Sequence, residues 1–201
     1  RVSAHVAPFH QGNGACVYTG RVETDIERIL IHRDQIQRRV HSLAQEGAAV
    51  YERSSSGLTL VPILAGSIIF LADLIRELPL KMKVALAQVS TYPGRAVSAQ
   101  RPRVVMDVNG DIAGREVLIV DDILDSGNTL RAVQALVRAR QPVSLRTAVL
   151  LRKTEKAPAD VPVDFVGFDI ENLFIVGYGL DYDDHYRNYP HIGVLRRELM
   201  S

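Results

Sequence analysis

Two hydrophobic patterns alternate along the chain. Short runs of apolar residues without polar breaks predict buried strands, and stretches with apolar residues every three or four positions predict amphipathic helices. The expected helices cover residues 34–50, with Asp34 as the capping residue, 68–78 and 130–140. The expected strands cover residues 58–64, 82–89, 103–108, 117–120, 143–151, 164–168, 174–176 and 191–195.

This alternation of strands and helices predicts an α/β fold with a central, mostly parallel sheet flanked by helices. With 201 residues, 47% of them hydrophobic, the chain is long enough for one domain with a sizeable core. Residues 1–23 contain three glycines and little periodicity, so we expect an irregular N-terminal arm there. Residues 24–201 are expected to form a single domain.

Composition limits the classes of partner and compartment. The chain has 24 basic and 23 acidic residues, so no charge excess favours a nucleic acid or a membrane surface. No apolar run approaches the roughly 20 residues of a transmembrane helix, and the start has no signal-peptide pattern. Cys16, the only cysteine, excludes an intramolecular disulfide. We therefore expect a cytoplasmic protein that acts on small molecules.

The most informative segment is residues 117–130, in which a buried strand leads through a short loop into a helix. Ligands of such sheets bind beyond the carboxyl ends of the strands. Backbone N–H groups at the helix start would bind a phosphate, and the candidate residues are Ser126, Gly127, Asn128 and Thr129. Asp121 and Asp122 are placed to bind a sugar diol or a divalent cation, and Asp125 lies between the two zones.

Local chemistry alone leaves a second interpretation open, because acid pairs at strand ends are often solvated caps. A Walker-type phosphate loop is excluded, since no G-x-x-x-x-G-K-[ST] occurs. The density of carboxylates, hydroxyls and glycine favours a site for a phosphorylated sugar.

Residues 117–130 resemble the phosphoribosyl pyrophosphate (PRPP) motif of the type I phosphoribosyltransferases. From Ile29 to Leu195 the chain resembles the hypoxanthine-guanine phosphoribosyltransferases, most specifically in residues 164–168, 176–182 and 186–188. The resemblance implies the type I phosphoribosyltransferase fold, with a small hood lobe built from N- and C-terminal segments. It also implies a homodimer or homotetramer.

The resemblance assigns the PRPP side of the site. Asp125 would carry a proton near N7 or N9 of the purine, and Asp121 and Asp122 would hold the ribose hydroxyls and Mg²⁺. The loop containing Ala65 and Gly66 would contact pyrophosphate together with Arg187. Ala65 stands where the family usually has lysine, which predicts altered PRPP affinity or altered coupling between subunits.

The resemblance also assigns the purine side. Lys153 would bind O6 of a 6-oxopurine, Phe174 would stack on the base, and Ile175 would offer backbone groups. Asp181 would accept indirectly from the base or hold a second Mg²⁺. Ser90, Thr91 and Tyr92 match the start of the family's lid over the reaction centre.

The implied reaction converts PRPP and hypoxanthine or guanine into IMP or GMP and pyrophosphate, which is purine salvage. Two alternatives stay open at this point. One is a non-catalytic regulator of the same fold that senses nucleotides. The other is a sister transferase that uses xanthine or another base.

Overall fold

The computed structural model describes residues 22–90, 103–106, 110 and 112–200. The helices are α1 (Val22–Asp25), α2 (Arg33–Tyr51), α3 (Ile68–Glu77), α4 (Asn128–Ala139) and the 3-10 helix η1 (Arg197–Leu199). The strands are β1 (Ile26–Ile31), β2 (Leu58–Leu64), β3 (Met82–Val84), β4 (Ala87–Ser90), β5 (Arg103–Met106), β6 (Glu116–Leu124), β7 (Ser144–Lys153), β8 (Phe165–Ile170), β9 (Ile175–Val176) and β10 (Ile192–Leu195).

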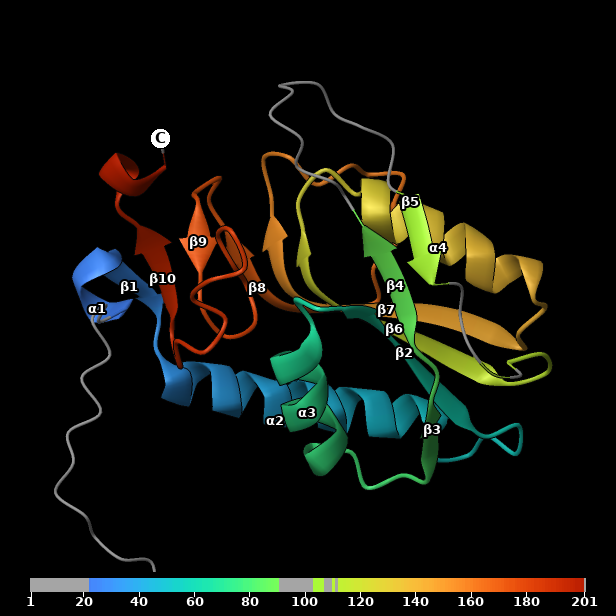
Figure 1. Ribbon diagram of the computed structural model, residues 1–201. Coiled ribbons are helices and arrows are strands. Elements are labelled where there is room, and N and C mark those ends of the chain that lie inside the picture. The colour runs from blue at the N-terminus through green and yellow to red at the C-terminus, as the bar shows by residue number, and fades with distance from the viewer. Residues whose placement is uncertain (1–21, 91–102, 107–109, 111, 201) are drawn as a thin grey trace, which may run out of the picture.

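The large sheet has the strand order β5-β4-β2-β6-β7-β8, and β3 pairs with β2 (Figure 1). All neighbouring pairs are parallel except β4 and β5. The predicted α/β fold with a mostly parallel central sheet is therefore confirmed. Among the described residues no helix combines the length and apolarity needed to cross a membrane.

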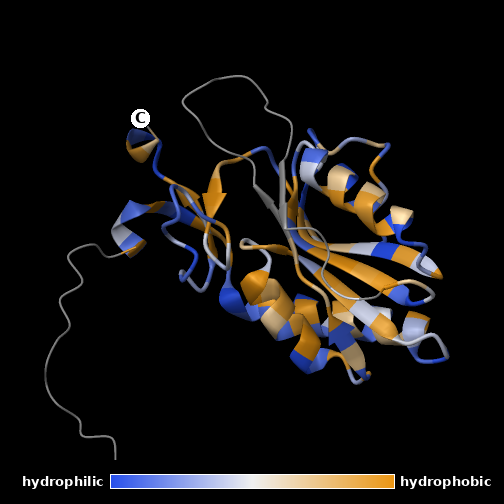
Figure 2. Cartoon of the chain, turned by 45° about the vertical axis from the view of Figure 1, so that its right-hand side comes forward, coloured by the Kyte–Doolittle hydropathy of each residue, from blue (hydrophilic) through white to orange (hydrophobic). Residues whose placement is uncertain are grey.

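Helices cover both faces of this sheet, which explains why its central strand is apolar without alternation. Successive strand residues point to opposite faces. Leu118 and Val120 of β6 pack in the cluster that contains α2 and α3, and Val117 and Ile119 pack in the cluster that contains α4. In Figure 2 the strands of this sheet are largely orange, and helices lie on both sides of them.

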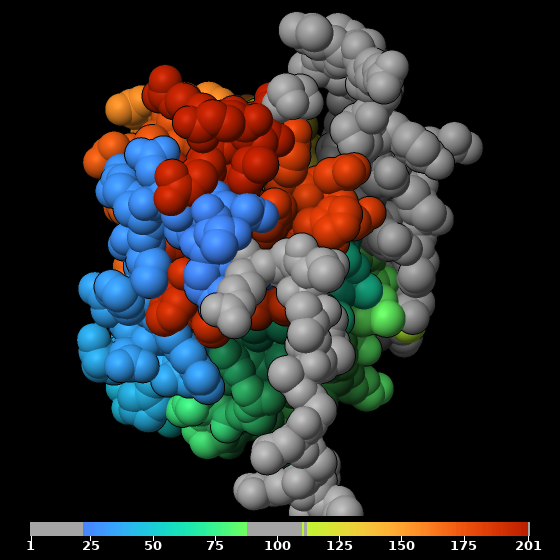
Figure 3. All heavy atoms as spheres, turned by 60° about the vertical axis from the view of Figure 1, so that its left-hand side comes forward, coloured from blue at the N-terminus to red at the C-terminus, as the bar shows by residue number. Residues whose placement is uncertain are grey.

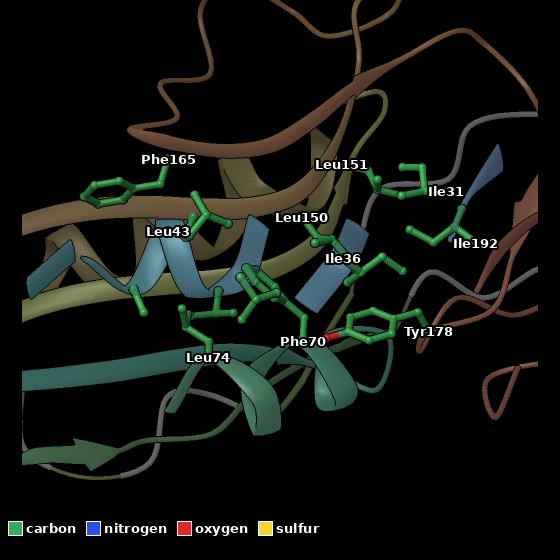
Figure 4. Packing of buried hydrophobic residues seen from close by; sticks show 14 of the residues in the cluster. Ile31, Ile36, Leu43, Phe70, Leu74, Leu150, Leu151, Phe165, Tyr178 and Ile192 are labelled. Carbon is green, nitrogen blue, oxygen red and sulfur yellow. The ribbon is translucent and has the colours of Figure 1, made fainter. Parts of the chain in front are cut away.

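The core beneath α2 and α3 is built from large side chains that are almost fully buried. Figure 4 shows Ile36 and Leu43 of α2, Phe70 and Leu74 of α3, and Leu150 of β7 in one cluster. This packing joins α3 to the sheet directly after the loop that follows β2, so the loop starts from a rigid base.

A second, three-stranded antiparallel sheet has the order β1-β10-β9 and joins the two ends of the described chain. Ile26, Val176, Tyr189 and Leu195 form its own small core. Figure 3 shows the N-terminal and C-terminal segments side by side on one face. This sheet is the small lobe that the predicted fold includes. The irregular arm predicted for residues 1–23 is described only at Val22 and Glu23, because residues 1–21 lie outside the described part.

Several predicted boundaries were wrong. Val22 and Glu23 belong to α1 rather than to an irregular arm, and β1 was not recognised. The cap of α2 is His32 rather than Asp34, and the His32 N–H donates to Gln35 Oε1 at 2.9 Å. The strand expected at 82–89 is split into β3 and β4, which pair with different parts of β2.

Two further corrections matter for the site. β6 continues to Leu124, because its pairing with β7 extends to Leu124 opposite Arg152. Asp121 and Asp122 therefore lie within the end of the strand, not after it. β7 in turn extends to Lys153, which pairs with Ile170 of β8 and is held by the sheet on that side.

Candidate active site

A cleft of about 210 Å³ opens at the carboxyl end of β6. It is bounded by two loops of the same kind, each joining a strand to a helix. Its lining residues are Ile63, Leu64, Gly66, Asp121, Asp122, Ile123, Asp125, Ser126, Gly127, Asn128, Thr129 and Leu130. The structure thus brings Gly66 of the loop after β2 together with the predicted PRPP residues of the loop after β6, whereas Ala65 does not line the cleft.

Gly127 is the N-cap of α4 and has φ +73°, a left-handed conformation that residues with a side chain rarely adopt. A Cβ at this position would lie 2.7 Å from Pro158 Cγ. The glycine therefore allows the tight turn after β6 and directs the first turn of α4 toward the cleft. The free N–H groups at the start of this helix favour an anionic ligand.

Asp121 and Asp122 are a close pair of carboxylates in the cleft. Asp121 Oδ1 accepts from the Asp122 N–H at 3.1 Å, and Asp122 Oδ1 accepts from the Ile123 N–H at 2.8 Å. Burial, together with the neighbouring Asp122 charge, raises the pKa of Asp121 well above its ordinary value. Burial also raises the pKa of Asp122, and the positive charge of Arg187 partly opposes that rise. A pair of this kind favours binding of a cation or a diol.

Asp125 is paired with two lysines at the end of β7. Lys153 Nζ donates to Asp125 Oδ2 at 2.8 Å, and Lys156 Nζ lies 3.6 Å from Asp125 Oδ1. Lys153 is only 7% exposed, so its charge is held beside the cleft rather than in open solvent. Sequence reasoning gave Lys156 no role, since a lysine in a turn is usually a surface charge.

The loop after β2 lies directly against this carboxylate pair. A Cβ at Gly66 would be 1.8 Å from Asp122 Oδ2, so only glycine permits the approach. The Leu64–Ala65 peptide is cis. Ser67 Oγ donates to the Ile63 carbonyl at 2.7 Å and closes the loop on itself. Ala65 carries no charge into the site, which leaves backbone groups as the loop's donors.

Arg187 of the C-terminal segment is near enough for its charge to act on Asp122, but it lines a neighbouring hollow rather than the cleft itself. Its Nη1 lies 2.9 Å from the Gly179 carbonyl and 2.8 Å from Asp181 Oδ1, and its Nη2 lies 2.8 Å from Asp184 Oδ1. Asp181 is therefore an ion-pair partner of Arg187 in this structure. Among the residues described, no group of three or more histidine, cysteine, aspartate or glutamate side chains is arranged to hold a metal.

Only some of the residues predicted to bind the purine lie beside the cleft. Phe174 is 43% exposed and packs edge-on against Tyr182, with ring centroids 5.5 Å apart. It lines a separate hollow of about 510 Å³ beside β10, not the cleft around Asp121. Ile175 is buried in β9. In the predicted lid, Ser90 ends β4, and Thr91 and Tyr92 lie outside the described residues.

Comparison with known proteins decides the family. The model of the phosphoribosyl transferase domain family matches residues 32–183. The chain belongs to this family. It is 38% identical over 172 residues to the hypoxanthine-guanine phosphoribosyltransferase of Bacillus subtilis, covering 86% of this chain and 94% of that protein. It is 39% identical over 188 residues to the enzyme of the same name from Mycobacterium tuberculosis H37Rv, covering 92% and 91%.

Solved phosphoribosyltransferase structures agree with this placement. A hypoxanthine phosphoribosyltransferase from Staphylococcus aureus superposes with a TM-score of 0.82 at 34% identity, covering 89% of this chain and 96% of that one. The Trypanosoma cruzi enzyme in complex with the product IMP gives a TM-score of 0.80 at 36% identity, covering 90% and 100%.

In this phosphoribosyltransferase, Asp121→Asn is expected to stabilise the ligand-free protein at pH 8. Folding raises the pKa of the Asp121 carboxyl above its value in the unfolded chain, which is about 4. The free energy of unfolding therefore falls as the pH rises from the unfolded pKa through the folded pKa. Asparagine does not titrate, so the variant should melt about 2–6 °C higher at pH 8. Melting curves between pH 4 and pH 8 check this. The difference should shrink toward pH 4, and a gain independent of pH would contradict the explanation.

Proposed function

We propose that this chain transfers the 5-phosphoribosyl group of PRPP to N9 of hypoxanthine or guanine, giving IMP or GMP and pyrophosphate in purine salvage. The observation that carries the proposal is the cleft in which Asp121, Asp122 and Asp125 face two strand-to-helix loops. Beside the cleft, Lys153 donates a hydrogen bond to Asp125, and its positive charge suits a 6-oxo group. The family and the names of the similar enzymes support the same reaction.

The N-terminal turn of α4 would bind the 5′-phosphate through the N–H groups of residues 126–129 and the hydroxyls of Ser126 and Thr129. Asp121 and Asp122 would accept from the ribose 2′- and 3′-hydroxyls. As the bond between C1′ and pyrophosphate breaks, positive charge develops on the ribose. The carboxylates of the cleft are already oriented to stabilise that charge.

Asp125 would take or hold the proton at the imidazole nitrogens of the purine. For this, Lys153 would move its hydrogen bond from Asp125 to O6 of the base. A cationic donor favours a 6-oxopurine over adenine, whose 6-amino group is itself a donor. Phe174, Ile175 and Asp181 remain the proposed purine residues. Arg187 and the Leu64–Ser67 loop would bind the leaving pyrophosphate.

The carboxylates of the cleft suit Mg²⁺, since this ion is usually bound by one or two protein carboxylates together with substrate oxygens and water. Asp121 and Asp122 would hold it, and Asp181 is the proposed residue for a second ion. Bound Mg²⁺ supplies positive charge that neutralises and orients the pyrophosphate of PRPP. The raised pKa of Asp121 indicates a carboxylate that gains from a nearby cation.

Removal of divalent cations is expected to lower kcat/KM for PRPP by about 10²-fold or more, because the substrate's charges are then unscreened. Dialysis against a chelator, followed by assay with and without added Mg²⁺, measures this. Full activity in the chelator would contradict the role given to Asp121 and Asp122.

The reaction is tested by incubating the protein with PRPP, Mg²⁺ and each base, and following nucleotide by absorbance. Hypoxanthine and guanine should give product. Product with xanthine alone, or with a non-purine base, would indicate the sister transferase. Binding of PRPP without product from any base would indicate the regulator. We further propose that the enzyme works in the cytoplasm as a homodimer or homotetramer.

A further inference from the structure

The protein groups that we propose to bind pyrophosphate come from two distant parts of the chain. The Leu64–Ser67 loop lies between β2 and α3, and Arg187 lies more than a hundred residues later. The distance between the loop and Arg187 must be maintained if both are to contact the leaving group. Ala65 supplies no charged side chain in the loop, so the backbone position of this loop determines how well it can contact an anion.

The two parts touch through glycine backbones. A Cβ at Gly179 would lie 2.1 Å from the Gly66 carbonyl oxygen, so the C-terminal segment rests directly on the loop. Arg187 and Gly179 are joined by two hydrogen bonds, one to each backbone polar group of Gly179. Its Nη1 donates to the Gly179 carbonyl at 2.9 Å, and its carbonyl accepts from the Gly179 N–H at 3.0 Å.

Tyr178, the neighbour of Gly179, is buried and links the C-terminal segment to α3. Its hydroxyl donates to Asp73 Oδ2 on α3, the helix that begins at the end of the Leu64–Ser67 loop. Figure 4 shows the Tyr178 ring beside Phe70, with its hydroxyl directed toward α3. The side chain is 4% exposed, and Asp73 is also paired with Arg76.

The backbone of Tyr178 is in the left-handed region, with φ +51°, which costs free energy for a residue with a side chain. Its N–H donates to the Tyr189 carbonyl at 2.7 Å. Burial, with the hydrogen bond to Asp73, raises the pKa of the Tyr178 hydroxyl. The hydroxyl therefore stays protonated and remains the donor.

We propose that Tyr178 is a positioning residue that fixes the Leu64–Ser67 loop against Gly179 and Arg187 through its hydrogen bond to Asp73, and so sets affinity for pyrophosphate and PRPP. This inference rests on the proposed function for its choice of ligand. Tyr178 does not line the cleft around Asp121. Its effect passes through α3 on one side and through Gly179 on the other.

The test compares Tyr178→Phe with Tyr186→Phe, which is a matched control. Tyr186 also donates its hydroxyl to an aspartate, Asp25, at 2.9 Å, but in the small lobe. Y178F should raise KM for PRPP about three- to tenfold, because a hydrogen bond to a charged group is lost. Its kcat and its KM for the purine should stay within about twofold of wild type, as should all three values in Y186F.

Asp73→Asn, alone and combined with Y178F, checks the route of the effect. If both residues act through their shared hydrogen bond, the double variant should be no worse than the more affected single variant. An unchanged KM for PRPP in Y178F, or equal increases in KM for PRPP and purine, would overturn the proposal.

Titration calorimetry with inorganic pyrophosphate and Mg²⁺ reads the same geometry without turnover. Y178F should bind more weakly than Y186F and wild type, and equal affinity in all three would overturn the inference. If wild type forms no nucleotide with any base but Y178F still binds pyrophosphate more weakly, only the proposed reaction fails. If wild type binds no pyrophosphate, both proposals fail.

Discussion

Asp125→Asn is expected to lower kcat by about 10²–10⁴-fold with the fold intact. The amide cannot take a proton from the purine, and it lacks the negative charge that pairs with Lys153 and Lys156. Because the side chain is partly exposed at the edge of the cleft, the change removes chemistry rather than core packing. Steady-state kinetics with PRPP and hypoxanthine measure the effect.

Asp169→Asn is the matched control for this experiment. Asp169 accepts from Arg152 Nε at 2.7 Å, beside Lys153 at the same end of the sheet, but it does not line the cleft. Its replacement should leave kcat within about twofold, since exposed ion pairs contribute little to stability. Near-normal turnover in Asp125→Asn, or equal losses in both variants, would remove Asp125 from the proposed proton transfer.

Gly66→Ala is expected to lower kcat/KM for PRPP by about 10²-fold, because a displacement of about 1 Å in a reacting geometry has an effect of this size. The added Cβ would lie 1.8 Å from Asp122 Oδ2, so either the carboxylate or the loop must shift. Assays over a range of PRPP concentrations measure the loss, and crystal structures of the variant show which group moved.

Gly47→Ala controls for the added methyl group. Gly47 lies within α2, and a Cβ there would meet only Leu78 Cδ2, at an ordinary 3.6 Å. Alanine in a helix is more stable than glycine by about 0.5–1 kcal/mol, so this variant should melt slightly higher and keep full activity. Wild-type kinetics in Gly66→Ala would show that Asp122 and the loop have room that the structure does not indicate.

The local features of this phosphoribosyltransferase could be predicted from its sequence alone. Apolar runs and helical spacing identified the strands and helices of the large sheet, because burial between two helical layers requires apolar residues on both faces of a strand. The segment from Asp121 to Thr129 could be recognised as a candidate phosphate site for a similar reason. Its carboxylates, glycine and helix start are adjacent in the chain, so their chemistry needs no long-range contact to be visible.

Only the tertiary structure decided what depends on residues far apart in the chain. Sheet pairing extended the carboxyl end of β6 from residue 120 to Leu124 and that of β7 from residue 151 to Lys153, and it placed Lys153 against Asp125. β1 escaped prediction because its partner, β10, lies at the other end of the chain. Tyr178 and Gly179 fall within a stretch that resembles the family, but neither they nor Asp73 carry a local signal of a contact between α3 and the C-terminal segment. The role proposed for them rests on a backbone contact and a hydrogen bond between segments about a hundred residues apart, which sequence periodicity cannot encode.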